Sequence, residues 1–91
     1  MLTLDSVVLT TTDVVTRESG NELVIVSPAK GKYLVLNQTG AIVFRLLDGK
    51  TSLQSIAMHL CQNHQAPLEK AQADVLALAE QLLERGIVMV P

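Results

Sequence analysis

The 91-residue sequence contains almost no aromatic side chains: one Tyr, one Phe and no Trp. Its core must therefore be built from Leu, Val, Ile and Ala, and a hydrophobic content of 48% excludes a disordered chain. Cysteine is equally scarce, and the single Cys61 cannot form an internal disulfide. This usage fits a reducing compartment, so the expected location is the cytoplasm.

Long apolar runs and an excess of one charge are also lacking. No run approaches the roughly 18 residues of a membrane span, and the first residues, "MLTLDSVVLTTTD", have no basic segment typical of a secretory signal. The net charge of −2 argues against a broad surface for nucleic-acid phosphates. A chain of this length predicts a single domain, residues 1–91.

Groups that could perform chemistry are few and scattered. His59, Cys61 and His64 form the one cluster of soft ligands, but zinc needs more protein ligands than these provide. Cys61 falls on an apolar helical stripe, where a free cysteine is usually a small buried hydrophobe. No glycine-rich phosphate loop follows a strand. We therefore expect no catalytic residue, no metal and no cofactor.

What is present begins with three β-rich stretches, at residues 13–19, 22–27 and 32–37. They are rich in Val and in other residues that favour strands. The short links between them carry Gly, Asn and Pro, which favours antiparallel neighbours joined by tight turns. This pattern predicts a three-stranded meander with the third strand at an edge.

Helical periodicity starts directly after the third strand. Asn37 is suited to cap a helix that ends near Asp48-Gly49, where glycine supplies a left-handed residue. Thr51 and Gln54 have the spacing of a capping box for a second helix, which continues to about residue 61.

A third helix is expected from Pro67 to about Arg85, before Gly86, and the tail after it is too short to assign. Strands followed by helices predict an α+β fold, with the helices on one face of a small antiparallel sheet. The second and third helices have the lengths of a helix-turn-helix pair, so the predicted architecture is winged-helix-like.

The third strand and the third helix are more apolar than a small core requires. Both alternating faces of residues 32–36 are apolar, although one face of a small sheet should be polar. Leu76 and Leu83 add a second apolar line to the helix. Each of these residues alone could equally cover the core. Together they predict a groove that can accept an extended peptide as an added strand.

The third helix also tests the idea of a DNA-binding regulator. A helix that recognises bases in the major groove of DNA should expose Arg, Lys, Asn or Gln. This helix instead carries Lys70 and Arg85 against four carboxylates, and no nucleic-acid partner is expected.

Three stretches, "GKYLVLNQTGAIVFRLLDG" (31–49), "TSLQSIAMHL" (51–60) and "ADVLALAEQLLERGIV" (73–88), resemble the PqqD-like peptide chaperones, also called precursor-peptide recognition elements. The resemblance covers about residues 13–88. Its most specific parts are Gly31-x-Tyr33-x-x-Leu36-Asn37-x-Thr39-Gly40, Asp74-Val75 and Arg85-Gly86. The sequence around Tyr33 is most similar to that of the small standalone members found in lasso-peptide biosynthesis.

This resemblance implies a non-catalytic protein that binds the leader segment of a ribosomally made precursor peptide and presents it to an enzyme. In lasso-peptide pathways that enzyme is a leader-cleaving cysteine protease, and in the quinone-cofactor pathway it is a radical enzyme. The leader docks on the third strand, beside the third helix. The expected site residues are Lys32, Tyr33, Leu34, Val35, Leu36, Asp74, Val75, Leu76, Ala79 and Leu83.

Lasso-peptide maturation is the first expectation and pyrroloquinoline quinone biosynthesis the second. A winged-helix regulator and an adaptor domain with an unrelated partner remain as alternatives. A free edge strand can also pair with a second copy of the chain, which leaves a homodimer open. Thr39 and Gly40 are expected to be structural, with Gly40 placed where a side chain would crowd the sheet.

Overall fold

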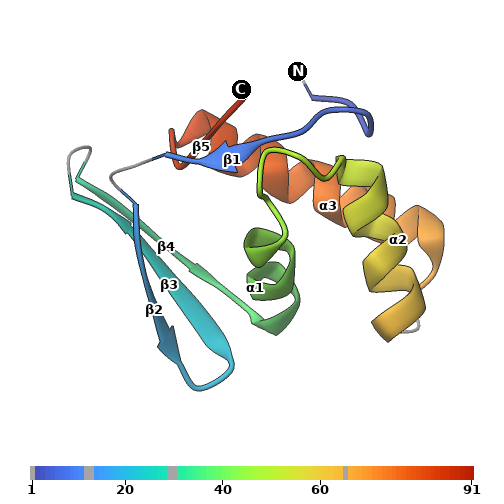
Figure 1. The fold of residues 1–91 in the computed structure, drawn as a ribbon. Coiled ribbons are helices and arrows are strands. Elements are labelled where there is room, and N and C mark those ends of the chain that lie inside the picture. Colours follow the sequence, from blue (N-terminus) through green and yellow to red (C-terminus); the bar gives the residue numbers. More distant parts are fainter. Residues whose placement is uncertain (1, 12–13, 29–30, 65) are drawn as a thin grey trace.

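The computed structural model describes residues 2–11, 14–28, 31–64 and 66–91. Three strands, β2 (Val15–Ser19), β3 (Glu22–Ser27) and β4 (Lys32–Leu36), form an antiparallel sheet in the order β2-β3-β4 (Figure 1). This confirms the predicted meander. The expected start of the first strand, Asp13, lies outside the described residues.

Strand register divides the sheet into two faces. Leu23 pairs with Leu36 and Ile25 with Leu34, and three of these four side chains are buried. The opposite face carries the pairs formed by Val24 with Val35 and by Val26 with Tyr33. Because alternate residues of a strand point to opposite faces, the first set faces the core and the second faces away from it.

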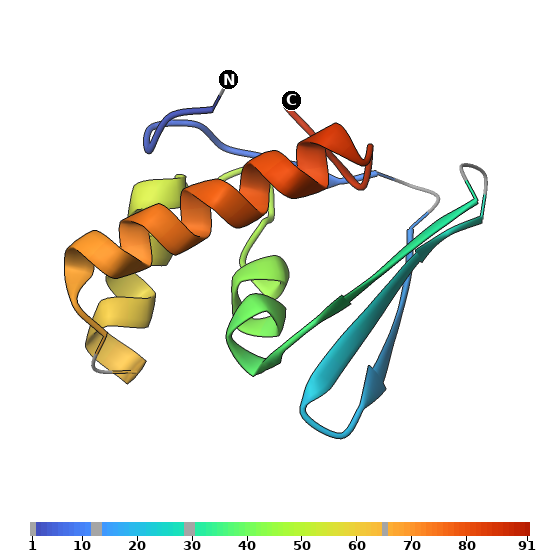
Figure 2. The same ribbon diagram turned by 180° about the vertical axis from the view of Figure 1, so that it is seen from behind.

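Three helices follow the sheet: α1 (Gln38–Arg45), α2 (Leu53–His64) and α3 (Leu68–Glu84). The α+β class is therefore as predicted. The helices do not share the sheet equally, however. Helix α1 contacts β3 and β4, whereas α2 lies on the far side of α1 and packs against α3, which runs past α1 to β5 (Figures 1 and 2). The sheet thus projects from the helical part of the molecule and is joined to it through α1.

The helix ends differ in part from the expected caps. Ser52, rather than Thr51, caps α2, since its Oγ accepts from the N–H of Ser55 at 3.2 Å. The N–H and hydroxyl groups of Thr51 instead donate to Asp48, at 2.8 and 3.1 Å. Helix α3 ends as expected: Gly86 has φ of 71°, and its N–H donates to the carbonyl of Leu83.

The first ten residues add an element that the sequence patterns did not predict. Strand β1 (Leu9–Thr10) pairs antiparallel with β5 (Val88–Met89) in a separate two-stranded sheet. The carbonyls of Leu4 and Ser6 accept from the N–H groups at the start of α2, at 2.8 and 3.0 Å. The N-terminal segment thus satisfies main-chain donors that α2 leaves free at its first turn.

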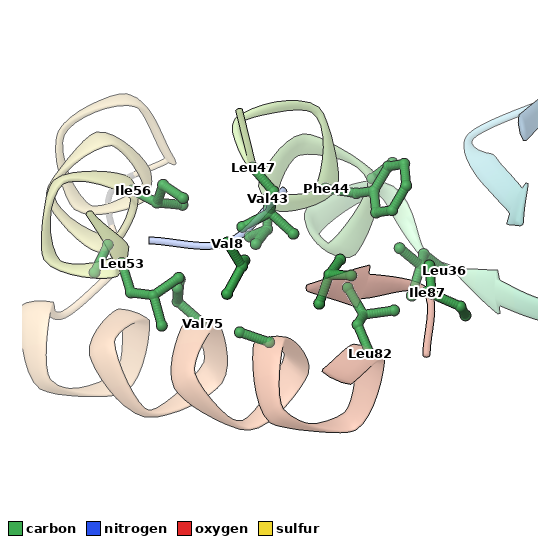
Figure 3. Close-up of a cluster of buried hydrophobic side chains, with 14 of the residues drawn as sticks. Val8, Leu36, Val43, Phe44, Leu47, Leu53, Ile56, Val75, Leu82 and Ile87 are labelled. Carbon is green, nitrogen blue, oxygen red and sulfur yellow. The ribbon is translucent and has the colours of Figure 1, made fainter. Parts of the chain in front are cut away.

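The hydrophobic core lies between α1, α2 and α3 and extends under β4 (Figure 3). It is aliphatic apart from Phe44, as the composition predicted. Val8, which directly precedes β1, and Ile87, which directly precedes β5, both extend into the core and are completely buried. No described helix is long and apolar enough to cross a membrane.

Candidate functional site

Strand β4 is an edge strand in the described part of the chain, because β3 is its one partner in the sheet. Its other side faces toward α3 (Figure 2). An edge of this kind presents main-chain N–H and C=O groups that can pair with a further strand. The sequence predicted this position for the third strand, and the fold confirms it.

A groove of about 520 Å³ lies between β4, α1 and α3. Two residues of β4 line the groove on one side and residues of α3 line it on the other. The turn between β4 and α1 closes one end. The lining consists of Val35, Leu36, Asn37, Thr39, Gly40, Val43, Lys70, Asp74 and Leu78. An apolar hollow beside an unpaired strand combines the two features that strand addition requires: a backbone partner and a pocket for side chains.

The groove has an apolar floor and a charged rim. Leu36 and Val43 are buried and belong to the core, so the floor is rigid. On the rim, the Nζ of Lys70 lies 3.1 Å from Oδ2 of Asp74, one helical turn away. Both side chains are more than half exposed. Among the described lining residues, they are the two that carry a charge.

The turn from β4 into α1 fixes the end of the groove. Asn37 Oδ1 accepts from the N–H of Gly40 at 2.8 Å and caps α1, as predicted. A Cβ on Gly40 would lie 3.1 Å from the Cβ of Leu36. This confirms that Gly40 sits where a side chain would crowd the sheet.

The structure brings together three of the expected site residues at the groove: Val35, Leu36 and Asp74. Lys32, Tyr33 and Leu34 precede them along β4. Val75 and Ala79 are completely buried in the core, so neither side chain is open to a ligand in this structure.

Leu76 and Leu83 are not among the described residues that line this groove. Leu76 is four residues after Gln72, whose side-chain amide donates to Gln54 of α2 at 2.9 Å. Residues four apart share a flank of a helix, so this flank of α3 faces α2. Lys70, Asp74 and Leu78, also spaced by four, form the groove flank instead. The sequence analysis did not select Lys70 or Leu78, although their spacing was visible.

The outer face of the sheet is a second exposed apolar feature. Val15, Tyr33 and Val35 have exposed fractions of 58%, 69% and 44%. Val26 pairs with both Val15 and Tyr33, so these side chains lie in one row across the three strands. Contiguous apolar surface of this kind usually marks an interaction site.

Other candidate centres are weaker. A pocket of about 190 Å³ lies between the β2–β3 turn and α1, where Arg45 forms an ion pair with Glu18. No three described His, Cys, Asp or Glu side chains are grouped closely enough to hold a metal ion. Cys61 is half-buried, and the side chain of His64 lies outside the described part of the structure.

Two solved structures resemble this fold. One is described as TbiB1 in complex with the TbiA(beta) leader peptide, with a TM-score of 0.78 and 18% identity, covering 88% of this chain and 93% of that one. The other is a lasso peptide synthetase B1 complexed with the leader peptide, with a TM-score of 0.80 and 22% identity, covering 90% of this chain and 96% of that one. At these identities, the likeness establishes the fold.

Sequence comparison establishes the family. A PqqA binding protein of Gluconobacter oxydans (strain 621H) is 37% identical over 60 residues, which are 66% of this chain and 62% of that protein. The family model for coenzyme PQQ synthesis protein D (PqqD) matches residues 22–88, which include β3, β4, all three helices and every residue of the groove. The chain belongs to the PqqD family.

Proposed function

We propose that this protein binds the leader segment of a ribosomally made precursor peptide by strand addition and presents it to a modifying or leader-cleaving enzyme. The observation that carries this proposal is the unpaired edge of β4 beside the groove. Main-chain pairing supplies affinity independent of sequence, and the groove selects the side chains. The leader-peptide complexes of the two similar structures support this reading.

The proposed role is non-catalytic, and the chemistry belongs to the partner enzyme. We place the protein in lasso-peptide biosynthesis, in line with the structural neighbour that is described as a lasso peptide synthetase B1. The relative that binds PqqA supports the second candidate, a chaperone of pyrroloquinoline quinone biosynthesis, equally well. Precursor peptides encoded beside the gene distinguish the two pathways, because each has its own precursor.

Hydrogen exchange of β4 amides tests the binding mode. In an antiparallel ladder, alternate residues direct their N–H groups to opposite neighbours. Adding a leader peptide from a neighbouring precursor gene should therefore protect every second amide of residues 32–36, namely those not already paired with β3. Protection spread over α2 instead would place the peptide elsewhere.

Pairing of β4 with a second copy of the chain would compete with the peptide, because one strand edge holds one neighbour. Sedimentation of the free protein over a range of concentrations separates the two cases. If a dimer forms through β4, the leader peptide should dissociate it. A dimer that binds the peptide without dissociating would exclude β4 as the shared edge.

A further inference from the structure

We propose that the Lys70–Asp74 pair on the rim of the groove controls which peptide charges the groove accepts. This inference rests on the proposed peptide-binding function. The two groups face the groove from one flank of α3, and they supply one positive and one negative charge to its described lining. The rest of that lining is apolar or uncharged, so the net charge of the groove is zero.

The pair is weak enough to open but close enough to act as a unit. Exposed ion pairs spaced by four on a helix contribute little to stability, because water screens them. A carboxylate on the peptide could therefore attract Lys70, but Asp74, with its oxygen 3.1 Å from the ammonium, would repel it. A cationic side chain on the peptide would be attracted by Asp74 and repelled by Lys70. For either sign, attraction and repulsion nearly cancel.

An uncharged apolar side chain meets no such conflict. It can cover the floor formed by Leu36, Val43 and Leu78 while the rim charges stay paired with each other. Displacing water from the groove strengthens the pair, since the local dielectric falls. A charged guest side chain would instead lose water without a full counter-charge.

The Lys70–Asp74 pair thus makes the groove selective for an uncharged apolar segment of the peptide, and removing either partner converts it to a groove selective for one charge. In Lys70→Gln, the carboxylate of Asp74 is left to attract a peptide Lys or Arg. In Asp74→Asn, the ammonium of Lys70 is left to attract a peptide Asp or Glu. Asp74→Asn keeps the side-chain size, Lys70→Gln shortens the side chain but keeps it polar, and both replace exposed groups, so the fold should be retained.

Selection from a displayed library of random peptides, with the full chain as bait, tests the proposal. The wild type should enrich apolar peptides without preference for either charge. Lys70→Gln should enrich basic peptides and Asp74→Asn acidic ones. For a selected peptide and its charge-reversed version, the dissociation constants on each variant should differ by about three- to tenfold, and the difference should shrink at high salt.

Glu69→Gln is the matched control, because Glu69 is an exposed carboxylate on the same helix outside the groove lining. It should select the same peptides as the wild type. Circular dichroism confirms that each variant is folded. Equal charge preferences in the wild type and in both rim variants would overturn the proposal. If the folded wild type enriched no peptide at all, the proposed peptide-binding function would fail, and this inference with it.

Discussion

Asn37 links the edge strand to the helix that supports it. Its side chain satisfies the N–H of Gly40, which has no partner within α1. Asn37→Ala should lower the free energy of unfolding by about 1 kcal/mol, the usual cost of losing a cap. Urea denaturation measures this change. Asn37→Asp keeps the acceptor oxygen and should remain close to the wild type, and equal losses in both variants would show that the cap does not stabilise α1.

The hydrogen bonds that the carboxylate of Asp48 accepts should make the stability of the fold depend on pH. The N–H of Lys50 and then that of Thr51 donate to its carboxylate and hold its pKa below the ordinary value of 3.8. A lowered folded-state pKa contributes stability that is present above the unfolded pKa and is lost as the pH falls through the folded pKa. Thermal unfolding of wild type and Asp48→Asn should therefore differ at pH 6, and the difference should shrink as the pH falls below the unfolded pKa of about 4 and vanish below the folded pKa. A constant difference across this range would contradict the assignment.

The groove shows what a helical pattern can predict at single residues. Gly40 was correctly placed because its crowding follows from a strand that runs directly into a helix. On α3, the groove lining includes Asp74, which the sequence had indicated, together with Lys70 and Leu78, which it had not. Periodicity identifies the buried stripe but not which neighbour lies on each side of it, since that depends on how the helix is rotated in the fold. Lys70 and Leu78 were therefore passed over in favour of Leu76, although both flanks follow from the same spacing.

The N-terminal segment makes an element-scale prediction. Residues 2–10 supply Leu2 and Val8 to the core and carbonyl acceptors to α2. Deleting residues 1–10 should lower the free energy of unfolding by about 3 kcal/mol or more, since losing a single large buried side chain commonly costs 2–5 kcal/mol. Urea denaturation again provides the measurement. Deleting the exposed Val90 and Pro91 is the matched control and should change little. A truncated protein as stable as the wild type would show that the segment is dispensable.

The strands of the main sheet were predictable, whereas the β1-β5 ribbon was not. Strands β2 to β4 are five or six residues long, enough for β-branched composition and flanking turns to be visible. Strands β1 and β5 are two residues each and are separated by nearly the whole chain. A pair that short has no periodicity, and its partners meet only because the packing of α3 brings the two chain ends together.

At the scale of the whole molecule, the projecting sheet leaves its outer face open. Helix α1 contacts β3 and β4 on the inner face, and the proposed peptide lies at the edge of β4, so neither covers the row of Val15, Val26 and Tyr33 on the outer face. A guest strand beside β4 would widen this sheet by one strand. The outer face thus remains available as an apolar surface for the proposed partner enzyme.

Val15→Lys tests this assignment, because Val15 lies on β2, at the opposite edge of the sheet from β4. The variant should bind leader peptide as the wild type does, while its affinity for the proposed processing enzyme should fall by about 1–3 kcal/mol, as for other apolar interface residues. Fluorescence anisotropy of labelled peptide and calorimetry with the enzyme separate the two effects. Thr16→Lys is the matched control, since Thr16 is exposed on the other face of the same strand. Loss of enzyme binding in both variants would point to the added charge rather than the outer face, and no loss in Val15→Lys would place the enzyme on another surface.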